Sequence, residues 1–228
     1  MKLYLAPMEA LTGYIFRNVY NRYFGDADRY FTPFIASRKL NSKEKNDVLP
    51  EHNQNMDVIP QILTNKSEEF CYIASRLKEY YGYEEVNLNL GCPSGTVVAK
   101  NRGSGFLAIP DELNRFFEEV FSRTDVRISV KTRTGVENNE NWENILKIYN
   151  DYPISELIIH PRCRKDGYGG KPNLEDFKKA VLISRHSLCY NGDINSVEDY
   201  NAITKEFPTV DKIMCGRGIL MNLSLIHI

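Results

Sequence analysis

The chain has 228 residues, with 29 Lys and Arg against 30 Asp and Glu, so its formal net charge is -1. A hydrophobic share of 42% and a charged share of 26% are ordinary for a globular domain and exclude a disordered or fibrous chain. No stretch approaches the roughly 20 apolar residues of a membrane span, and bulk charge alone does not indicate a nucleic-acid binder. We expect a cytoplasmic protein that is monomeric and does not associate with membranes.

The predicted strands and helices alternate along the whole chain. The strands are eight short β-rich runs: Lys2–Ala6, Arg29–Thr32, Val58–Leu63, Glu85–Leu90, Arg127–Thr132, Glu156–His160, Leu188–Asn191 and Asp211–Cys215. Helical patterns lie between them at Ser67–Tyr81, Pro110–Ser122, Asn141–Asp151, Leu174–Ser184 and Ser196–Lys205. This alternation predicts a (β/α)8 barrel, with a doubly wound open sheet as the alternative. The length favours the barrel.

The five cysteines are scattered along the chain, at Cys71, Cys92, Cys163, Cys189 and Cys215. They form no CxxC pair and have no His at metal-ligand spacing, so the sequence indicates no metal site. Their odd number argues against a disulfide framework, and we expect reduced thiols.

Polar side chains recur at the carboxyl ends of strand after strand. They comprise Pro7-Met8-Glu9, Gln61, Asn89 with Cys92, Lys131 with Arg133, His160 with Arg162, Asn191-Gly192-Asp193 and Gly216-Arg217-Gly218. In a barrel the carboxyl ends of all strands meet at one mouth. The pattern therefore predicts a single site at that mouth.

The segment Asn87–Ser94, which reads Asn-Leu-Asn-Leu-Gly-Cys-Pro-Ser, is the most informative motif. It places Cys92 in the loop just after a strand that carries inward-pointing amides. The alternative is a buried structural cysteine. No local sequence signature supplies a base for a nucleophilic thiol, and a free thiol with a pKa of about 8.5 is mostly protonated at neutral pH. Such a thiol suits a general acid that protonates one carbon of an activated C=C bond while hydride reaches the other.

The last two predicted strands lead into glycine-containing loops, Asn191-Gly192-Asp193 and Gly216-Arg217-Gly218. These are the usual loops for phosphate in a barrel. Lys131 ends a buried-looking strand and needs an anionic partner, which is either a reduced flavin ring or a nearby carboxylate. His160 is either a ligand contact or a core histidine bonded to backbone.

Basic residues gather in loops that follow strands. The clusters are Arg38, Lys39, Lys43 and Lys45; Lys100 and Arg102; Lys131 and Arg133; and Arg162, Arg164, Lys165 and Lys171. Each cluster is either a solvated surface or part of a contact with an anionic polymer.

From Ala6 to about Met221 the chain resembles the tRNA-dihydrouridine synthases. The resemblance rests on an ordered set of motifs: Ala6-Pro7-Met8-Glu9, Gln61-Ile62-Leu63, Asn87 to Ser94, Lys131-Thr132-Arg133-Thr134-Gly135, Ile159-His160-Pro161-Arg162, Asn191-Gly192-Asp193-Ile194 and Gly216-Arg217-Gly218. It implies a flavin-dependent barrel that reduces a uridine in tRNA. FMN would be held by Pro7, Met8, Glu9, Gln61, Lys131, His160, Asn191, Gly192, Asp193, Gly216 and Arg217.

The same resemblance implies NADPH as the reductant and a uridine flipped out of its tRNA loop onto the flavin. Cys92 would give a proton to C5 while hydride goes to C6, and Asn89 would read the uracil edge. Lys100 and Arg102 would meet RNA phosphates, and Arg162 completes the predicted substrate set.

The chain departs from the family pattern in two places. Pro161 and Cys163 stand where family members usually have Gly and Thr. Family members also continue with an eighth helix and a helical tRNA-binding domain, which this sequence lacks. The last six residues, 223–228, resemble a reading frame of a transposon-derived sequencing adapter, so we expect a catalytic barrel over 1–222 and a non-native tail.

Two rival functions remain at this stage. The first is a flavoenzyme that acts on a free pyrimidine, of the dihydroorotate or dihydropyrimidine dehydrogenase type, whose loop typically reads Ser-Cys-Pro. The second is a flavin- or RNA-binding barrel that has lost catalysis, against which the intact Cys92 and Lys131 argue.

Overall fold

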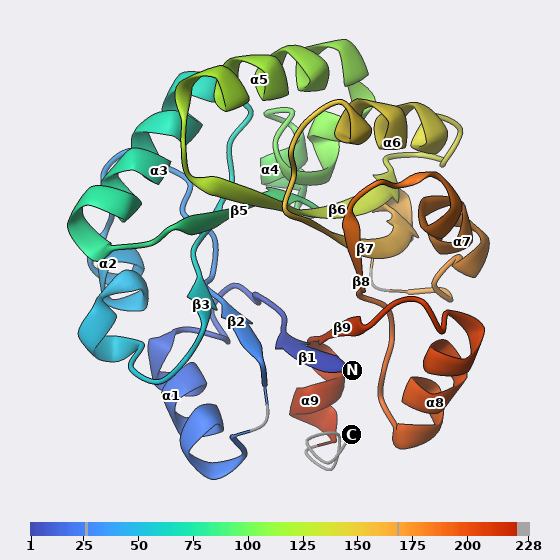
Figure 1. The fold of residues 1–228 in the computed structure, drawn as a ribbon, viewed down its shortest axis with the longest axis horizontal. Helices are drawn as coiled ribbons and strands as arrows, with labels where there is room; N and C mark the ends of the chain where they lie inside the picture. Colours follow the sequence, from blue (N-terminus) through green and yellow to red (C-terminus); the bar gives the residue numbers. More distant parts are fainter. Residues whose placement is uncertain (26, 168, 223–228) are drawn as a thin grey trace.

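The computed structural model describes residues 1–25, 27–167 and 169–222. Nine strands form one parallel sheet in the order β3-β2-β1-β9-β8-β7-β6-β5-β4 (Figure 1). The strands are β1 (Lys2–Leu5), β2 (Arg29–Phe31), β3 (Val58–Ile59), β4 (Gln61–Ile62), β5 (Glu85–Leu90), β6 (Arg127–Gly135), β7 (Glu156–Cys163), β8 (Ser187–Tyr190) and β9 (Lys212–Cys215).

The single strand predicted over Val58–Leu63 is divided at Pro60 into β3 and β4. Proline has no N–H for a sheet hydrogen bond, so the ladder is interrupted there. β3 pairs with β2 and β4 pairs with β5, and the Asn87 N–H donates to the Pro60 carbonyl at 2.8 Å. The two halves of this strand thus join the ends of the sheet. The predicted (β/α)8 barrel is confirmed, and the open sheet is excluded.

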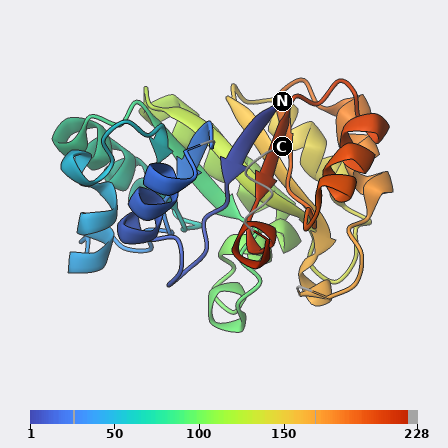
Figure 2. The ribbon, with the colours of Figure 1, turned by 90° about the horizontal axis from the view of Figure 1, so that it is seen from below.

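Helices surround the sheet on its outer face (Figure 1). They are α1 (Tyr14–Tyr23), α2 (Ser42–Val48), α3 (Ser67–Tyr81), α5 (Pro110–Arg123), α6 (Trp142–Asn150), α7 (Leu174–Ile183) and α8 (Val197–Glu206). Two short helices, α4 (Gly95–Val98) and α9 (Arg217–Met221), lie instead at the end of the barrel toward which the strands point (Figure 2). Short 3-10 turns lie at Pro50–His52, Gly103–Ala108 and Arg164–Asp166. The five predicted helices correspond to α3, α5, α6, α7 and α8, with ends that agree within two residues. None of the described residues belongs to a helix long and apolar enough to cross a membrane.

The helix α1 was not predicted, because its cap is not local. Gly13 precedes it without a side-chain cap, and its first turn has no acidic residue. Instead, Asp47 accepts a hydrogen bond from the Tyr14 N–H at 2.6 Å, from a position 33 residues further along the chain. The helix α2 was also missed, although Asn41 and Glu44 form a capping box that the sequence does contain.

Side chains alternate between the two faces of each strand and so form two hydrophobic layers, one outside the sheet and one inside the barrel. Leu3 and Leu5 of β1 belong to the large core between sheet and helices, whereas Tyr4 belongs to a smaller cluster inside the barrel. In β7, Leu157 and Ile159 face the helices in the same way, and Ile158 joins the inner cluster. The inward side of each strand is therefore the side that leads to the mouth.

All five cysteines are free thiols, as the sequence predicted. The hexapeptide 223–228, predicted to be a non-native tail, lies outside the described residues.

Candidate functional site

A cavity of about 390 Å³ opens where the strands end. Figure 2 shows the strands pointing toward this end of the barrel, where α4 and α9 also lie. Its wall contains every predicted flavin contact together with the predicted catalytic and base-reading residues: Pro7, Met8, Glu9, Gln61, Asn89, Cys92, Lys131, His160, Asn191, Gly192, Asp193, Gly216 and Arg217. The barrel thus brings together residues that are spread over more than 200 positions of the sequence.

Three predicted substrate residues do not line this cavity. Lys100 is exposed just after α4, and its carbonyl accepts a hydrogen bond from the Asn65 amide. Arg102 forms an ion pair with Glu69 at 3.0 Å, and Arg162 is 1% exposed and paired with Asp193. The guanidinium groups of Arg102 and Arg162 thus form ion pairs within the protein, and contact with a substrate stays a prediction for all three residues.

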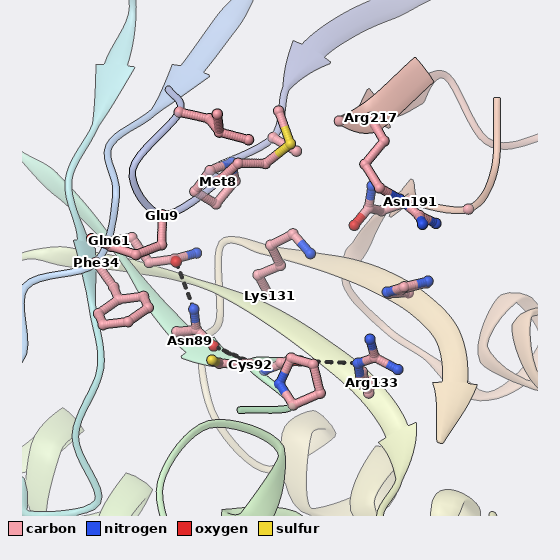
Figure 3. Close-up of a pocket in the computed structure, with 18 of the residues that line it drawn as sticks. Met8, Glu9, Phe34, Gln61, Asn89, Cys92, Lys131, Arg133, Asn191 and Arg217 are labelled. Atoms are coloured by element: carbon pink, nitrogen blue, oxygen red, sulfur yellow. Dashed lines mark hydrogen bonds between the residues drawn. The ribbon is translucent and has the colours of Figure 1, made fainter. Parts of the chain in front are cut away.

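The Cys92 loop is held from two sides. The side-chain oxygen of Asn89 accepts hydrogen bonds from the backbone N–H groups of Gly91 and Cys92, at 3.0 and 2.9 Å (Figure 3). The hydroxyl of Ser104 donates to the Cys92 carbonyl at 2.8 Å. Gly103 has a φ of +56°, and a Cβ there would lie 2.8 Å from the Cys92 carbonyl oxygen, so this close approach requires glycine.

The thiol of Cys92 is partly buried in the cavity wall. Burial raises its pKa above the ordinary value, while the Ser94 backbone N–H and the charges of Arg133 and Lys131 act in the opposite direction. The thiol is therefore protonated at neutral pH, and groups that stabilise a thiolate lie beside it. This is the environment of a proton donor.

Lys131 projects into the middle of the cavity (Figure 3). It lies in register with Asn89 on β5 and with Ile158 on β7, on the inward side of the barrel. Burial, followed by the charge of Arg133, lowers the pKa of Lys131 to about 8. No carboxylate within the described ranges forms an ion pair with it, so the alternative of a lysine neutralised by a protein carboxylate is not what the structure contains.

Arg133, which the strand-end pattern predicted at the mouth without a role of its own, also lines the cavity. Its guanidinium donates to three backbone carbonyls: Gly91 at 3.0 Å, Cys163 at 2.8 Å and Gly167 at 2.7 Å. The sequence does carry a signal for it, because Arg133 follows Lys131 with the period of two that keeps both on the inward face. Arg133 connects the Cys92 loop to the end of β7.

His160 and Arg162 form one hydrogen-bonded group with Asp193. Arg162 donates to Nε2 of His160 at 3.0 Å and to both carboxylate oxygens of Asp193. An arginine can only donate, so Nε2 accepts and the proton of the neutral ring is on Nδ1. Burial, followed by the charges of Lys131 and Arg133, lowers the pKa of His160 to about 2, and the ring is neutral. The hydrogen bond from Arg162 lowers the pKa of Asp193.

The loops after β8 and β9 pack too closely for side chains at their glycines. A Cβ on Gly218 would lie 1.8 Å from the Ile194 carbonyl oxygen, and one on Gly216 would lie 3.3 Å from Ala6. On the opposite side, the Met8 N–H donates to the Thr12 hydroxyl at 2.7 Å.

Phe34, Leu11 and Asn195 line the cavity and were not predicted. Phe34 lies three residues beyond the end of β2, as Cys92 lies two residues beyond the end of β5, so the rule of strand ends could have found it. It was missed because an apolar side chain at a strand end has no distinctive chemistry. Phe34 lies on the same side of the cavity as Asn89 and Cys92 (Figure 3).

Two solved structures resemble this fold at low sequence identity. A variant of NCR from Zymomonas mobilis has a TM-score of 0.64 and 15% identity, with 99% of this chain and 85% of that chain covered. A structure of morphinone reductase has a TM-score of 0.63 and 12% identity, with 99% and 84% covered. These similarities show the barrel fold alone.

Sequence comparison is more specific. The family model described as "Dihydrouridine synthase (Dus)" matches residues 4–227. tRNA-dihydrouridine synthase B of Pasteurella multocida is 28% identical over 223 residues, which are 97% of this chain and 66% of that protein. Probable tRNA-dihydrouridine synthase 1 of Synechocystis sp. is 27% identical over 216 residues, with 94% and 60% covered. The chain spans about two thirds of the length of these relatives. It belongs to the dihydrouridine synthase family.

Proposed function

We propose that this chain is the catalytic barrel of an enzyme that reduces uridine to 5,6-dihydrouridine in tRNA, with FMN as its cofactor and NADPH as the reductant. Family membership supports this reaction. The observation that carries the proposal is the shared location of Cys92, a protonated thiol, and Lys131, a cation without a carboxylate partner among the described residues. Cys92 can donate a proton, and Lys131 can bind an anionic group of a ligand.

The residues of the cavity fit a flavin mononucleotide. The cation of Lys131 would pair with the edge of the isoalloxazine ring that gains negative charge on reduction. The glycine loops after β8 and β9, with the Arg217 side chain, offer backbone N–H groups and a positive charge to a phosphate. A cavity of about 390 Å³ is within the range of small-molecule sites.

In this proposal the cofactor is held by the predicted set: Pro7, Met8, Glu9, Gln61, Lys131, His160, Asn191, Gly192, Asp193, Gly216 and Arg217. The Nδ1–H of neutral His160 is a hydrogen-bond donor whose protonation does not change over the working pH range. Asp193 is neutralised by Arg162 and Arg217, so it does not repel a phosphate.

When bound, the flavin supplies a hydride to C6 of the target uracil. Cys92 gives its proton to C5, so the C5=C6 double bond becomes a single bond and the thiol becomes a thiolate. The Ser94 N–H, Arg133 and Lys131 stabilise that thiolate. Water then returns a proton to Cys92 before the next turnover.

Asn89 reads the base through a donor. Its side-chain oxygen already accepts two backbone N–H groups, and one hydrogen of its amide nitrogen is donated to Gln61. The second hydrogen on that nitrogen is the group left for a ligand, and it suits a uracil carbonyl rather than the N3–H.

The target base would reach the cavity as a flipped-out nucleotide of tRNA. Lys100 and Arg102 lie beyond the Cys92 loop, and contact between their side chains and RNA phosphates belongs to the proposal. Arg162, which is buried, would act on the substrate through His160 and Asp193. The division into a barrel over 1–222 and a non-native tail over 223–228 is proposed on the sequence alone.

The proposal is tested with the purified chain, FMN and tRNA transcribed in vitro. We expect a flavin spectrum that NADPH bleaches without oxygen, and dihydrouridine in the tRNA after incubation. Free uridine and uracil serve as competing substrates. Reduction of the free pyrimidine but not of tRNA would overturn the tRNA assignment, and a folded chain that binds no flavin would overturn the whole proposal.

A further inference from the structure

A directional chain of side-chain amides lies beneath the Cys92 loop. Asn89 accepts the Gly91 and Cys92 N–H groups and donates from its amide nitrogen to Gln61 Oε1 at 2.7 Å. Gln61 Nε2 donates to Asn87 Oδ1 at 2.8 Å, and Asn87 Nδ2 donates to the Ser129 hydroxyl at 3.0 Å. Donation runs in one direction from the cavity wall into the barrel.

This direction leaves each amide one consistent orientation. If Asn89 turned over, its NH₂ group would face the N–H groups of Gly91 and Cys92, and donors would oppose donors. Asn89 must therefore present NH₂ to Gln61, which must present its own NH₂ to Asn87. The orientation of each amide is therefore compatible with only one orientation of its neighbours.

Asn87 is the one side-chain amide of this hydrogen-bonded series that has not yet been assigned a role. It is fully buried, as are Gln61 and Ser129, and it does not line the cavity. Burying an asparagine costs free energy unless the polar atoms of its side chain are hydrogen-bonded. Both polar atoms of Asn87 are hydrogen-bonded, the oxygen to Gln61 and the nitrogen to Ser129. Its oxygen is the acceptor that holds the Gln61 amide in place.

We propose that Asn87 is a positioning residue for Cys92, acting through Gln61 and Asn89. It does not touch the reacting atoms. By fixing the Gln61 amide it fixes Asn89, and Asn89 holds the two N–H groups that shape the Cys92 loop. This inference rests on the proposed role of Cys92 as the proton donor for its functional meaning, but the positioning itself can be measured without substrate.

The test is the rate of Cys92 alkylation by iodoacetamide as a function of pH, in the full chain with FMN added. The tryptic peptide that spans residues 79–100 contains Cys92 and no other cysteine, so mass spectrometry reports this thiol alone. In Asn87→Leu the Gln61 NH₂ group loses its acceptor, so Gln61 no longer fixes Asn89, and Asn89 no longer fixes the Cys92 loop. We expect the rate of Cys92 alkylation at pH 8 to rise about tenfold, because a buried NH₂ group without an acceptor strongly favours other side-chain orientations of Gln61.

Two variants make the result specific. Asn87→Asp keeps an oxygen for Gln61, and the Ser129 hydroxyl can turn to donate to the second oxygen, so we expect a rate close to that of the wild type. Asn150→Leu is the matched control, because the Asn150 amide also donates one hydrogen bond and accepts one, to the Ile183 carbonyl and from the Arg185 N–H. Asn150 lies at the end of α6, where the strands begin. Asn150→Leu should lose stability without a change in Cys92 alkylation.

The proposal is overturned if Asn87→Leu alkylates with the wild-type rate and pH profile, or if Asn87→Asp is as fast as Asn87→Leu. It is also overturned if Asn150→Leu accelerates alkylation equally, since general loosening would then explain the effect. If Asn87→Leu does not fold, Ser129→Ala, which removes the partner of Asn87 Nδ2, is measured instead with a smaller rise expected. Failure of tRNA reduction leaves all of these readouts intact, so the two proposals fail separately.

Discussion

The side chain of Arg133 donates from Nε to the carbonyl oxygen of Gly91 at 3.0 Å, which ties β6 to the residue before Cys92 (Figure 3). The two terminal nitrogens of the same guanidinium donate to Cys163 and Gly167. A planar fork with donors on three sides can satisfy three carbonyls that a single ammonium cannot. The geometry of the Cys92 loop thus depends on an arginine and not merely on a positive charge.

Replacement of this fork gives the first prediction. Arg133→Lys keeps the charge but leaves two of the three carbonyls without their donor, and we expect the free energy of unfolding to fall by about 2–4 kcal/mol. Urea unfolding followed by circular dichroism measures this fall. Arg123→Lys, at the end of α5, is the surface control and should change stability by less than about 0.5 kcal/mol. Equal stability of Arg133→Lys and the wild type would show that charge alone is what this position requires.

The pH dependence of FMN binding follows from Lys131. Its pKa in the free protein is lowered to about 8, so its positive charge is lost as the pH rises through that value. We expect the affinity for FMN, measured by fluorescence quenching, to weaken above pH 8. A bound anion favours the charged lysine, so binding should also take up a proton.

Lys131→Met should bind FMN more weakly at pH 7 and lose the dependence around pH 8. The same shift has a consequence for stability: the unfolded lysine holds its proton up to about pH 10.4, so the apo protein should gain stability as the pH rises from 8 toward that value. If Lys131→Met keeps the wild-type pH profile of FMN binding, another group controls it.

Removal of the thiol separates the two half-reactions. In Cys92→Ala the cavity retains its flavin contacts, so reduction of bound FMN by NADPH should proceed at the wild-type rate. Formation of dihydrouridine in tRNA should fall by about 10²-fold or more, the typical contribution of a positioned general acid. Stopped-flow absorbance measures the first step, and mass spectrometry of the tRNA nucleosides measures the second. Unchanged dihydrouridine formation would remove Cys92 from the mechanism.

His160 is predicted to stay neutral in the folded protein. Its pKa is lowered to about 2, so its ring resonances in NMR should not titrate between pH 5 and 8. In the unfolded chain the pKa of His160 is about 6.5, so below that pH the unfolded chain binds a proton at His160 and the folded protein does not. The free energy of unfolding therefore falls as the pH falls. His160→Gln should remove this part of the acid sensitivity. A His160 ring that titrates near pH 6.5 would contradict the burial and the neighbouring cations as its controlling environment.

Gly218, in the first turn of α9, offers a test of packing. A Cβ at Gly218 would lie 1.8 Å from the backbone oxygen of Ile194. This contact is relieved only if the loop after β8, which contains Ile194, moves. We expect Gly218→Ala to lose about 2 kcal/mol or more of stability and to bind FMN weakly. Gly95→Ala is the matched control, because no atom lies within 4 Å of a Cβ there and Ala favours the helix α4. Similar melting temperatures for the two variants would contradict this account.

The sequence by itself determined the class of fold and most of the candidate site. Alternation of apolar residues with period two marks the inward and outward faces of each strand, and this signal is local. Because parallel strands of one barrel end at the same mouth, the strand-end rule alone brought Gln61, Asn89, Lys131 and His160 together. The structure places all four in one cavity, although β6 and β7 continue past their predicted ends to Gly135 and Cys163, and Gln61 begins β4.

The tertiary structure alone decided features that depend on atoms distant in the chain. Pro60 divides a strand so that its two halves pair with different neighbours, and Asp47 caps the helix α1 from 33 residues away. The roles of Arg133 and Arg162 likewise follow from the backbone and side-chain oxygens that surround them, not from their neighbours in sequence. Periodicity records which face a residue occupies, whereas a hydrogen-bond partner is known only once the chain has closed around it.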